Sequence, residues 1–396
     1  MDFCLRRALS LAALALAACE SSPAVDPLDD APPVLETYAR ILHAGYDDSV
    51  LGARELDGAL AAFVAAPDAT TFQAARQAWL DSRPAYLETE VARFYGGPID
   101  DPETGPEGRI NSWPMDEAYV DYVIGPGPAF ERVYGGVVND PSILADISAQ
   151  GLAELNQIDS EESVTTGYHA IEFLLWGQDR RDDGPGERPH TDFVAMGTAT
   201  DHERRAAYLT AVGALLVSDL ETVRDAWAPG APYRTSFVAL PPREGLTLIL
   251  RGMGSLSGSE LSGERMNVAY MTKDQEDEHS CFSDNTHVDA LHDALGIQNV
   301  YLGRYTRTDG SVVEGPSLSD LVRARDPELD ARMRMQLSAS VDAIGAIPTP
   351  FDQAIQGLDS APGRVAVRAA IDALRAQTAT IVEIADLFDV QLNLEE

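Results

Sequence analysis

Apolar residues recur every three or four positions along almost the whole chain, which is the spacing of one face of an α-helix. Two long stripes show it most clearly. The first, between about residues 203 and 227, contains Leu209, Val212, Leu216, Leu220, Val223 and Trp227. The second, near the C-terminus, contains Val367, Ile371, Leu374, Thr378, Ile381, Ala385 and Phe388. Few segments alternate as strands do, so we predict an all-α fold whose helices pack as antiparallel bundles.

The chain is long enough for two hydrophobic cores, since it has 396 residues. Its hydrophobic content of 45% and charged content of 23% are typical of a globular protein. A segment rich in Gly and Pro at 228–245 separates two halves of comparable size. We therefore predict an N-terminal helical domain at 34–230 and a C-terminal one at 231–396.

The N-terminus has the pattern of an export signal. Arg6 and Arg7 precede an apolar run from Ala8 to Ala18 that is too short to span a bilayer. The small residues before Cys19 resemble the cleavage box of bacterial lipoproteins, which implies a signal peptide at 1–18, a lipidated Cys19 and a flexible tether at 19–33. A plain signal peptide with an incidental cysteine is the alternative. By resemblance to lipoprotein sorting, Glu20 after the cysteine favours the outer membrane, with the protein facing the periplasm.

The formal net charge of −35 is unusually negative. It argues against nucleic acid or an anionic membrane surface as a partner, so membrane contact is expected through the lipid anchor only. The same charge would raise the local concentration of cations. An adaptation for solubility or salt explains it equally well.

The run from Gly167 to Gly177 is apolar apart from His169 and Glu172, which lie three positions apart and so share one helix face. The helix is expected to be interior, and a buried carboxylate must be paired, protonated or bound to a metal. One interpretation is a hydrogen bond between the two side chains that ties helices together. The other is half of a metal site, because imidazole and carboxylate at this spacing recur as ligands in helical bundles.

A second polar stripe lies on the predicted helix at about 70–94. It consists of Trp79, Arg83, Tyr86, Glu90 and Arg93, where a core seam would be expected. A solvated face with an internal salt bridge is one interpretation. Aromatic residues in the same row favour an enclosed cleft, in which Glu90 is the predicted third metal ligand.

Two further segments contain candidate ligands. The long loop at 95–123 includes Trp113 and is expected to be ordered, and Asp116 near Pro114 suits the start of a helix, where it acts either as a cap or as a site residue. The segment 275–287 is dense in acids and histidines, including Glu276, His279, Asp284 and His287. Its residues 284–286 are typical of a helix cap. The residues just beyond them, Asp289, His292 and Asp293, are predicted to lie on the solvated side of that helix.

Four segments in order carry a resemblance to a known family. Residues 167–172 read Gly-Tyr-His-Ala-Ile-Glu and resemble the Gly-x-His-x-x-Glu signature of the imelysin-like proteins. Residues 79–100, 113–123 and 262–301 resemble three other segments of that family, the last of them in its iron-regulated lipoprotein branch. The resemblance implies two four-helix-bundle-like domains packed side by side and a site near their interface. It also implies a role in bacterial uptake of iron or another metal, although the family is classed among peptidases.

From these observations the sequence predicts a lipid-anchored metal-binding protein that takes iron, with zinc or copper as alternatives. The predicted ligands are His169, Glu172, Glu90 and Asp116. The supporting residues are Arg83, Tyr86, Arg93, Trp113, Glu276, His279, Asp284 and His287. The two arginines either orient carboxylates or bind an anionic chelate. The partners expected are the metal ion or its chelate and a protein of the uptake system.

Two other functions stay open at this point. The first is a metallopeptidase in which Glu172 serves as the base for a metal-bound water. The second is a helical scaffold or ligand-binding protein in which His169 and Glu172 are purely structural. The sequence leaves undecided whether the protein is an enzyme.

Overall fold

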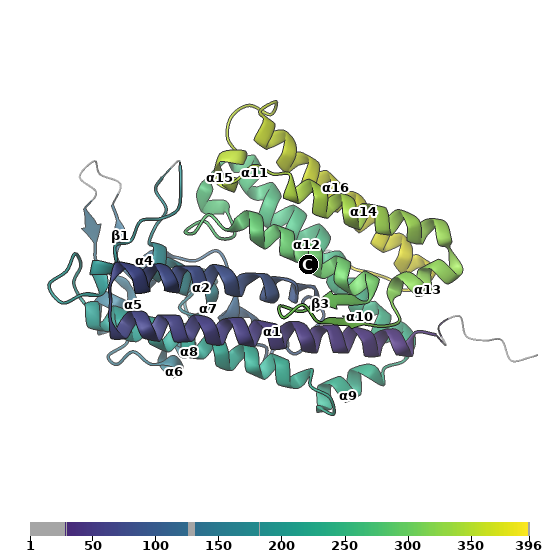
Figure 1. The fold of residues 1–396 in the computed structure, drawn as a ribbon, viewed down its shortest axis with the longest axis horizontal. Coiled ribbons are helices and arrows are strands. Elements are labelled where there is room, and N and C mark those ends of the chain that lie inside the picture. Colours follow the sequence, from purple (N-terminus) through teal and green to yellow (C-terminus); the bar gives the residue numbers. More distant parts are fainter. Residues whose placement is uncertain (1–27, 29, 126–130, 182, 395–396) are drawn as a thin grey trace, which may run out of the picture.

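The computed structural model describes residues 28, 30–125, 131–181 and 183–394. Its helices follow the long axis of an elongated molecule and form two layers, one from each half of the chain (Figure 1). The predicted signal peptide and Cys19 lie outside the described residues. The last part of the predicted tether belongs to the folded protein, since Leu28 and Ala31 are buried and the first helix begins at Pro32.

Four helices form most of the N-terminal layer. The apolar stripe at about 203–227 predicts α8 and the apolar run at 167–177 predicts α7, whereas the helix predicted at about 70–94 ends at Leu87, before Glu90. The helix α1 packs against α2 and α8, and α7 lies against both α2 and α8 (Figure 1). Their bounds are α1 Pro32–Ala65, α2 Ala69–Leu87, α7 Gly167–Trp176 and α8 His202–Ala226. Among the described helices only α8 is long and apolar enough to cross a membrane by length and composition. Its stripe instead packs inside the bundle, with Leu209, Leu216 and Leu220 fully buried.

Short elements connect α2 to α7 and α7 to α8. Strands β1 and β2 pair antiparallel, with Val123 opposite Val133. The connecting elements are η1 Glu90–Ala92, α3 Glu107–Ile110, α4 Glu117–Val120, β1 Val123–Ile124, β2 Arg132–Val133, α5 Gly136–Asn139, α6 Ala149–Leu155 and η2 His190–Phe193. As predicted, the segment at 95–123 is ordered, and it covers one end of α7.

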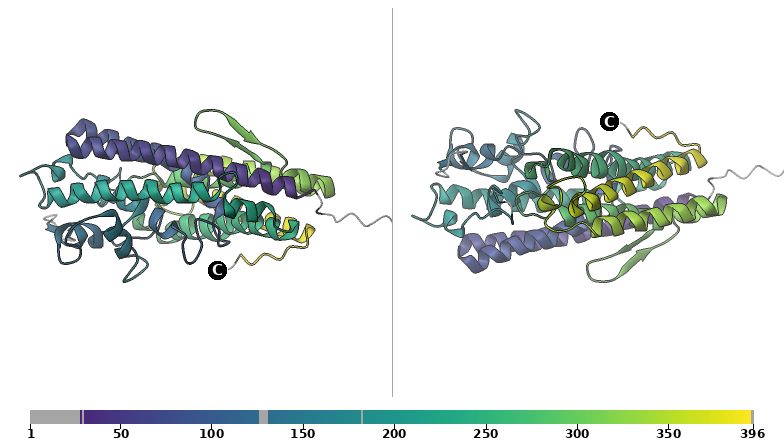
Figure 2. Two further views of the ribbon diagram at one scale, coloured as in Figure 1. Left: turned by 90° about the horizontal axis from the view of Figure 1, so that it is seen from below. Right: turned by 90° about the horizontal axis from the view of Figure 1, so that it is seen from above.

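The C-terminal layer is a second bundle, in which α16 packs on α14 and on the π-helix η3, and α12 packs on both α14 and η3. The short helix α9 Pro232–Val238 lies with the N-terminal layer, where it packs on α1 and α8 (Figure 1). The helices of the C-terminal layer are α10 Pro242–Ser255, η3 Leu256–Val268, α11 Ala269–Thr272, η4 Gln275–Asp277, α12 Thr286–Leu302, α13 Leu318–Arg325, α14 Pro327–Gly345, α15 Phe351–Ala354 and α16 Pro362–Leu387. The hairpin of β3 Arg304–Thr306 and β4 Val312–Glu314 projects beside α1 (Figure 2). The all-α fold is therefore confirmed, with two short hairpins in its described part.

One hydrophobic core cluster crosses between the layers. It contains Leu209 and Leu220 of α8 together with Leu250 of α10 and Ile297 of α12, whereas Leu374 of α16 belongs to a second cluster confined to the C-terminal half. The boundary between 230 and 231 stays a prediction. What matters for function is that α2, α7 and α12 meet where the two layers face each other.

Candidate functional site

The helix α7 is buried along its whole length and carries His169 and Glu172 into the interior. Glycine suits the first residue of this helix for two reasons. Gly167 has φ +81°, and a Cβ atom at this position would lie 2.4 Å from the carbonyl oxygen of Ile110. His169 Nδ1 and Glu172 Oε2 are 2.9 Å apart. His169 Nε2 is buried and has no hydrogen-bond partner. The predicted pair is thus formed, and it leaves one imidazole nitrogen unsatisfied.

The other oxygen of Glu172 is held by Ser283, which donates to Oε1 from its backbone nitrogen at 2.9 Å and from its hydroxyl at 2.6 Å. Burial raises the pKa of Glu172 to about 8, and these two hydrogen bonds oppose that shift. Burial also lowers the pKa of His169 well below its ordinary value, and the charges of His279 and Arg83 add to the effect. The imidazole is therefore neutral at neutral pH, the state in which it can bind a metal.

His279, from the loop before α12, joins this pair. Its ring centroid is 4.9 Å from that of His169, with the planes at 78°. Its Nδ1 is 2.7 Å from Asp289 Oδ2, and its Nε2 is 3.4 Å from the amide nitrogen of Asn111. Burial and the charge of Arg265 lower the pKa of His279 to about 4, although the bond to Asp289 opposes this. Both histidines are thus neutral, and each has a carboxyl group within hydrogen-bonding distance of Nδ1. The carboxyl group of Asp289 is ionised, whereas the pKa of about 8 leaves that of Glu172 mostly protonated at neutral pH.

Asp289 connects His279 to the Arg83 side chain of α2. Arg83 donates to Asp289 at 2.8 Å and to Asn111 Oδ1 at 2.7 Å. The prediction that Asp289 is solvated is wrong, because the side chain is fully buried. Asp289 lies this close to Arg83 because α12 packs tightly against the backbone at Glu88. A Cβ atom at Gly296 of α12 would lie only 2.5 Å from the carbonyl oxygen of Glu88, so glycine allows this approach. Burial disfavours the charged carboxylate, but Arg83 and His279 hold the pKa of Asp289 well below its ordinary value.

Glu90, the predicted third ligand, lies in a separate group of ion pairs. It contacts Arg93 at 3.1 Å, accepts from Asn111 Nδ2 at 3.1 Å, and also pairs with Arg265. Despite its burial, the charges of Arg265 and Arg93 hold the pKa of Glu90 well below its ordinary value. Arg265 also pairs with Asp293 at 2.7 Å. Asp293 is buried as well, so the prediction of a solvated position is wrong for it too.

A cavity of about 1100 Å³ lies beside the two histidines. His279, Asn111 and Trp113 line it, and the Trp113 ring is 5.0 Å from that of His169. Seven carboxylates line it as well, from Glu107, Glu161, Glu162, Glu260, Glu264, Glu276 and Asp277. Its two arginines, Arg93 and Arg265, are both engaged with carboxylates. The cavity is therefore negatively charged, and Trp113 and His279 lie between it and His169.

The other predicted site residues lie at various distances from this centre. Asp116 is exposed and accepts a hydrogen bond from the backbone nitrogen of Ala118 at 3.0 Å, which makes it the N-cap of α4. Tyr86 is buried against Tyr168, with ring centroids 5.2 Å apart. Glu276 lies at the cavity wall, whereas Asp284 and His287 are half-buried and do not line the cavity. Asn285 is the N-cap of α12, as predicted, but its amide donates to Asp289 at 3.0 Å instead of capping the helix.

His292, the third residue predicted to be solvated on α12, is partly buried and pairs with Glu88 at 2.7 Å.

Among the residues that the structure describes, no three His, Cys, Asp or Glu side chains converge as a ready-made set of metal ligands. The centre is better described as two imidazoles, each with a carboxyl group at hydrogen-bonding distance from Nδ1. In metal sites this second hydrogen bond fixes the tautomer and ring orientation and raises the basicity of Nε2. Sequence reasoning missed three residues that build this arrangement, namely Asn111, Ser283 and Asp289.

The sequence of the chain matches that of a known protein family. The family model described as imelysin, which is named as a peptidase family, matches residues 42–381. The chain belongs to the imelysin family. Iron-regulated protein A of Synechococcus elongatus is 26% identical over 344 residues, which cover 86% of this chain and 82% of that protein.

Two solved structures share the imelysin fold. A protein assigned as an iron-regulated protein A precursor, from Parabacteroides distasonis, superposes with a TM-score of 0.68 at 18% identity, over 93% of this chain and 97% of that one. An imelysin-like protein from Psychrobacter arcticum gives a TM-score of 0.64 at 14% identity, over 92% and 98% of the two chains. At these identities the likeness concerns the fold alone.

Proposed function

We propose that this protein is an iron-related member of the imelysin family that binds iron through the Nε2 atoms of His169 and His279. The observation that carries the proposal is the pair of buried, neutral imidazoles, each with a side-chain carboxyl group within hydrogen-bonding distance of Nδ1. Imidazole is a ligand for iron, zinc and copper alike. The name of the curated relative, iron-regulated protein A, is the reason for choosing iron among them.

This proposal changes the role of Glu172 from ligand to positioning residue. One oxygen of Glu172 faces His169 Nδ1 and the other accepts two hydrogen bonds from Ser283. The positive charge of a metal at Nε2 would favour the ionised form of Glu172, which then accepts a hydrogen bond from Nδ1–H and orients the ring. Asp289 has the same relation to His279. Binding then requires only that Asn111, whose amide is 3.4 Å from His279 Nε2, turns away.

The charge around the cavity favours a cationic ligand over an anionic chelate. Arg83 is fully buried and paired with Asp289, and Arg93 pairs with Glu90 and Glu107. Neither guanidinium is left with its charge unbalanced to attract an anion. The acidic wall instead raises the local concentration of cations. We therefore propose that the ion enters as an aquo ion or a small cationic complex and keeps part of its own ligand shell.

The observed arrangement favours binding over peptide hydrolysis. A hydrolytic metal site generally has about three protein ligands, an open position and a separate base. Here two imidazoles are available, while the neighbouring acids Glu90, Glu172 and Asp289 are all engaged by donors.

The proposal extends to a lipid-anchored protein that faces the periplasm and exchanges its metal with a protein of the uptake system. The anchor is tested by fractionating cells that produce the Cys19→Ser variant. The variant should appear in the soluble fraction, and its retention in the membrane fraction would contradict the anchor.

The function is tested by metal titration of the full chain purified in detergent. Bound metals are first determined by mass spectrometry, and Fe²⁺, Zn²⁺ and Cu²⁺ are then titrated into wild type, His169→Ala, His279→Ala and Glu172→Gln. We expect near-stoichiometric iron in wild type and its loss in both alanine variants. Glu172→Gln should weaken binding by about tenfold to a hundredfold, the usual cost of losing a carboxylate that orients a ligand.

His292→Ala is the matched control, because it removes a partly buried histidine that pairs with Glu88 away from the cavity. It should bind iron as wild type does. Unchanged affinity in both His169→Ala and His279→Ala, with circular dichroism showing that they fold, would overturn the proposal. Peptide cleavage by highly purified protein that is lost in the same variants would replace it with the peptidase function.

A further inference from the structure

Arg188, in the segment between α7 and η2, is a buried arginine with one edge of its guanidinium group unused. Its side chain is 1% exposed, and its Nη1 donates to Asp121 Oδ2 at 2.6 Å. Its Nε and Nη2 atoms are also buried and have no hydrogen-bond partner among the described residues. The rings of Tyr122 and Phe173, centred 4.7 and 5.1 Å from Cζ, offset part of the charge but offer no oxygen to these donors. Buried N–H groups without an acceptor are rare, because they lose their hydration without replacing it.

The same edge of other arginines in this protein holds a carboxylate. In Arg205, Nε and Nη2 donate to the two oxygens of Asp121 at 2.6 and 2.8 Å. In Arg109, they donate to the two oxygens of Asp219 at 3.0 and 2.7 Å. Two parallel N–H donors match the two oxygens of a carboxylate, which gives such a pair both strength and a fixed orientation. Arg188 presents the same two donors, and no carboxylate of the described chain fills them.

The charges around Arg188 leave one positive charge unbalanced. Asp121 pairs with both Arg188 and Arg205, at 2.6 Å from each. Burial disfavours the ionised form of Asp121, but the charges of these two arginines lower its pKa to about 2. Asp192 pairs with Arg132 at 3.3 Å and lies 3.7 Å from Arg188. Three guanidinium groups therefore share two carboxylates, and an anionic ligand would complete the balance.

Arg188 lines a cavity of about 380 Å³ at the C-terminal end of α7, a size typical of small-molecule sites. The apolar and aromatic residues of its wall are Tyr122, Ile124, Trp176 and Pro189. The other charged residues of its described wall are Arg132, Arg180, Arg181 and Glu187. Gly177 also lines it, and a Cβ atom there would lie 3.5 Å from Arg188 Nε. Glycine thus keeps a side chain away from the unused edge.

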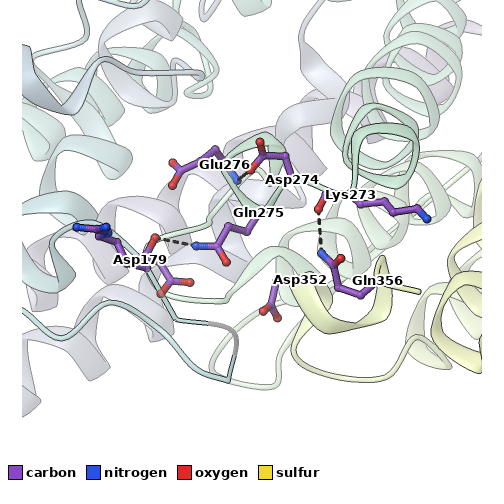
Figure 3. Close-up of a pocket in the computed structure, with 8 residues that line it drawn as sticks. Asp179, Lys273, Asp274, Gln275, Glu276, Asp352 and Gln356 are labelled. Carbon is purple, nitrogen blue, oxygen red and sulfur yellow. Dashed lines mark hydrogen bonds between the residues drawn. The ribbon is translucent and has the colours of Figure 1, made fainter. Parts of the chain in front are cut away.

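The segment that carries Arg188 is fixed by hydrogen bonds to the second half of the chain. The backbone nitrogen of Gly186 donates to the carbonyl oxygen of Phe282 at 2.9 Å, and the amide of Gln275 donates to that of Asp179 at 2.7 Å (Figure 3). The neighbouring cavity, drawn in Figure 3, has four acids and two basic residues in its described wall. An anion is therefore favoured in the arginine-lined cavity over this neighbour, and its binding group is held in place beforehand.

We propose that the arginine-lined cavity binds a small organic carboxylate with an apolar body. Its carboxylate pairs with Nε and Nη2 of Arg188, and its body contacts the wall formed by Tyr122 and Trp176. Phosphate matches the guanidinium edge as well, but it has no apolar part to contact that wall. This inference goes beyond the proposed iron function and does not depend on it, because no described residue lines both this cavity and the one beside the histidines.

The test is a calorimetric titration of phenylacetate and of 3-phenylpropionate into the full chain purified in detergent. We expect one bound acid per chain for at least one of the two. The corresponding amides have the same shape but lack the charge and the second oxygen, so they should not bind. Inorganic phosphate should bind at least about tenfold more weakly than the better acid, since it makes the polar contact alone.

Three variants locate the site. Arg188→Lys keeps a positive charge beside Asp121 but has no two-donor edge, so it should weaken binding of the acid by about tenfold or more. Arg109→Lys is the matched control, because it makes the same change at an edge that Asp219 already fills outside the cavity, and it should bind as wild type does. Arg132→Gln removes a partly exposed positive charge from the cavity wall and should also weaken binding.

Circular dichroism establishes that each variant folds. Absence of binding of both acids to folded wild type, equal affinity for the amides or phosphate, or full affinity in Arg188→Lys would overturn the site. If Arg188→Lys does not fold, full affinity in Arg132→Gln would overturn it instead. His169→Ala separates this inference from the proposed function, since it should lose iron and keep the acid. Loss of the acid in that variant would overturn a separate site, whereas a failure of iron binding alone would leave it intact.

Discussion

Glu278 and His279 are consecutive residues that end in opposite chemical surroundings. His279 bonds through Nδ1 to Asp289, whose charge Arg83 balances. Glu278 is buried among acids, and no arginine or lysine forms a salt bridge with it in the described part of the chain. One side of the loop thus presents an imidazole that Asp289 orients, and the other presents a buried carboxyl group whose neighbouring charges are mostly negative.

The difference teaches that burial of an ionisable group does not by itself identify a site. Asp289 and Glu278 are about equally buried, with 0% and 1% of their surfaces exposed. Asp289 accepts hydrogen bonds from Arg83, Ser280 and Asn285 and lies beside His279, so it is a satisfied member of the scaffold. Glu278 has no such partners. What distinguishes a binding group from a structural one is the polar atom left over after the protein's own contacts are made.

Among the substitutions that test this comparison, Asp289→Asn is expected to have the largest effect on the free energy of unfolding. The variant keeps the shape of the side chain but removes the charge that balances Arg83, so a buried guanidinium is left uncompensated. Breaking a buried pair in this way costs about 3–5 kcal/mol of unfolding free energy. Urea denaturation of the metal-free protein measures it, with Asp372→Asn as the control, because its exposed pair contributes about 0–1 kcal/mol. Equal stability of the two variants would show that Asp289 is not the counterion of Arg83.

The same substitution type should act in the opposite direction at Glu278. In chelator at neutral pH, Glu278→Gln should stabilise the protein by about 1–3 kcal/mol, because it removes a buried carboxylate whose desolvation is uncompensated. Thermal unfolding of wild type and variant in chelator measures the difference in stability. A variant less stable than wild type in chelator would mean that Glu278 has a partner and that the contrast with Asp289 is false.

Much of the fold could be predicted because helical periodicity is a local property. The stripe between about residues 203 and 227 gave α8, which spans His202–Ala226, to within one residue at each end. In the polar row, Trp79, Arg83, Tyr86 and Glu90 are buried as its aromatic members suggested, and Arg93 is partly buried. The pairing of His169 with Glu172 followed from their spacing on one face. These inferences need no knowledge of what the helix packs against.

The partners of those residues could not be predicted, because they come from the other half of the chain. Asp289 and Asp293 were assigned to a solvated face on the strength of their charge, yet they share a stripe with Gly296 and Val300 at positions i, i+4, i+7 and i+11. A stripe that continues into a glycine and an apolar residue is a packed one, and that signal was present. Nothing local indicates that Asn111 lies between Glu90, Arg83 and His279.

The smallest effect on stability and iron affinity is expected from Asp116→Asn, because Asp116 belongs to neither side of the comparison. It is an exposed acid whose carboxylate accepts one described hydrogen bond, from the backbone nitrogen of Ala118, and so caps α4. It therefore resembles neither the balanced Asp289 nor the unbalanced Glu278. Because asparagine caps a helix as well as aspartate does, Asp116→Asn should change stability by less than about 0.5 kcal/mol and leave iron affinity unchanged. Parallel denaturation and iron titration check this. A tenfold weaker affinity at unchanged stability would make Asp116 a ligand after all, and would mean that the loop at 95–123 closes over the histidines when metal binds.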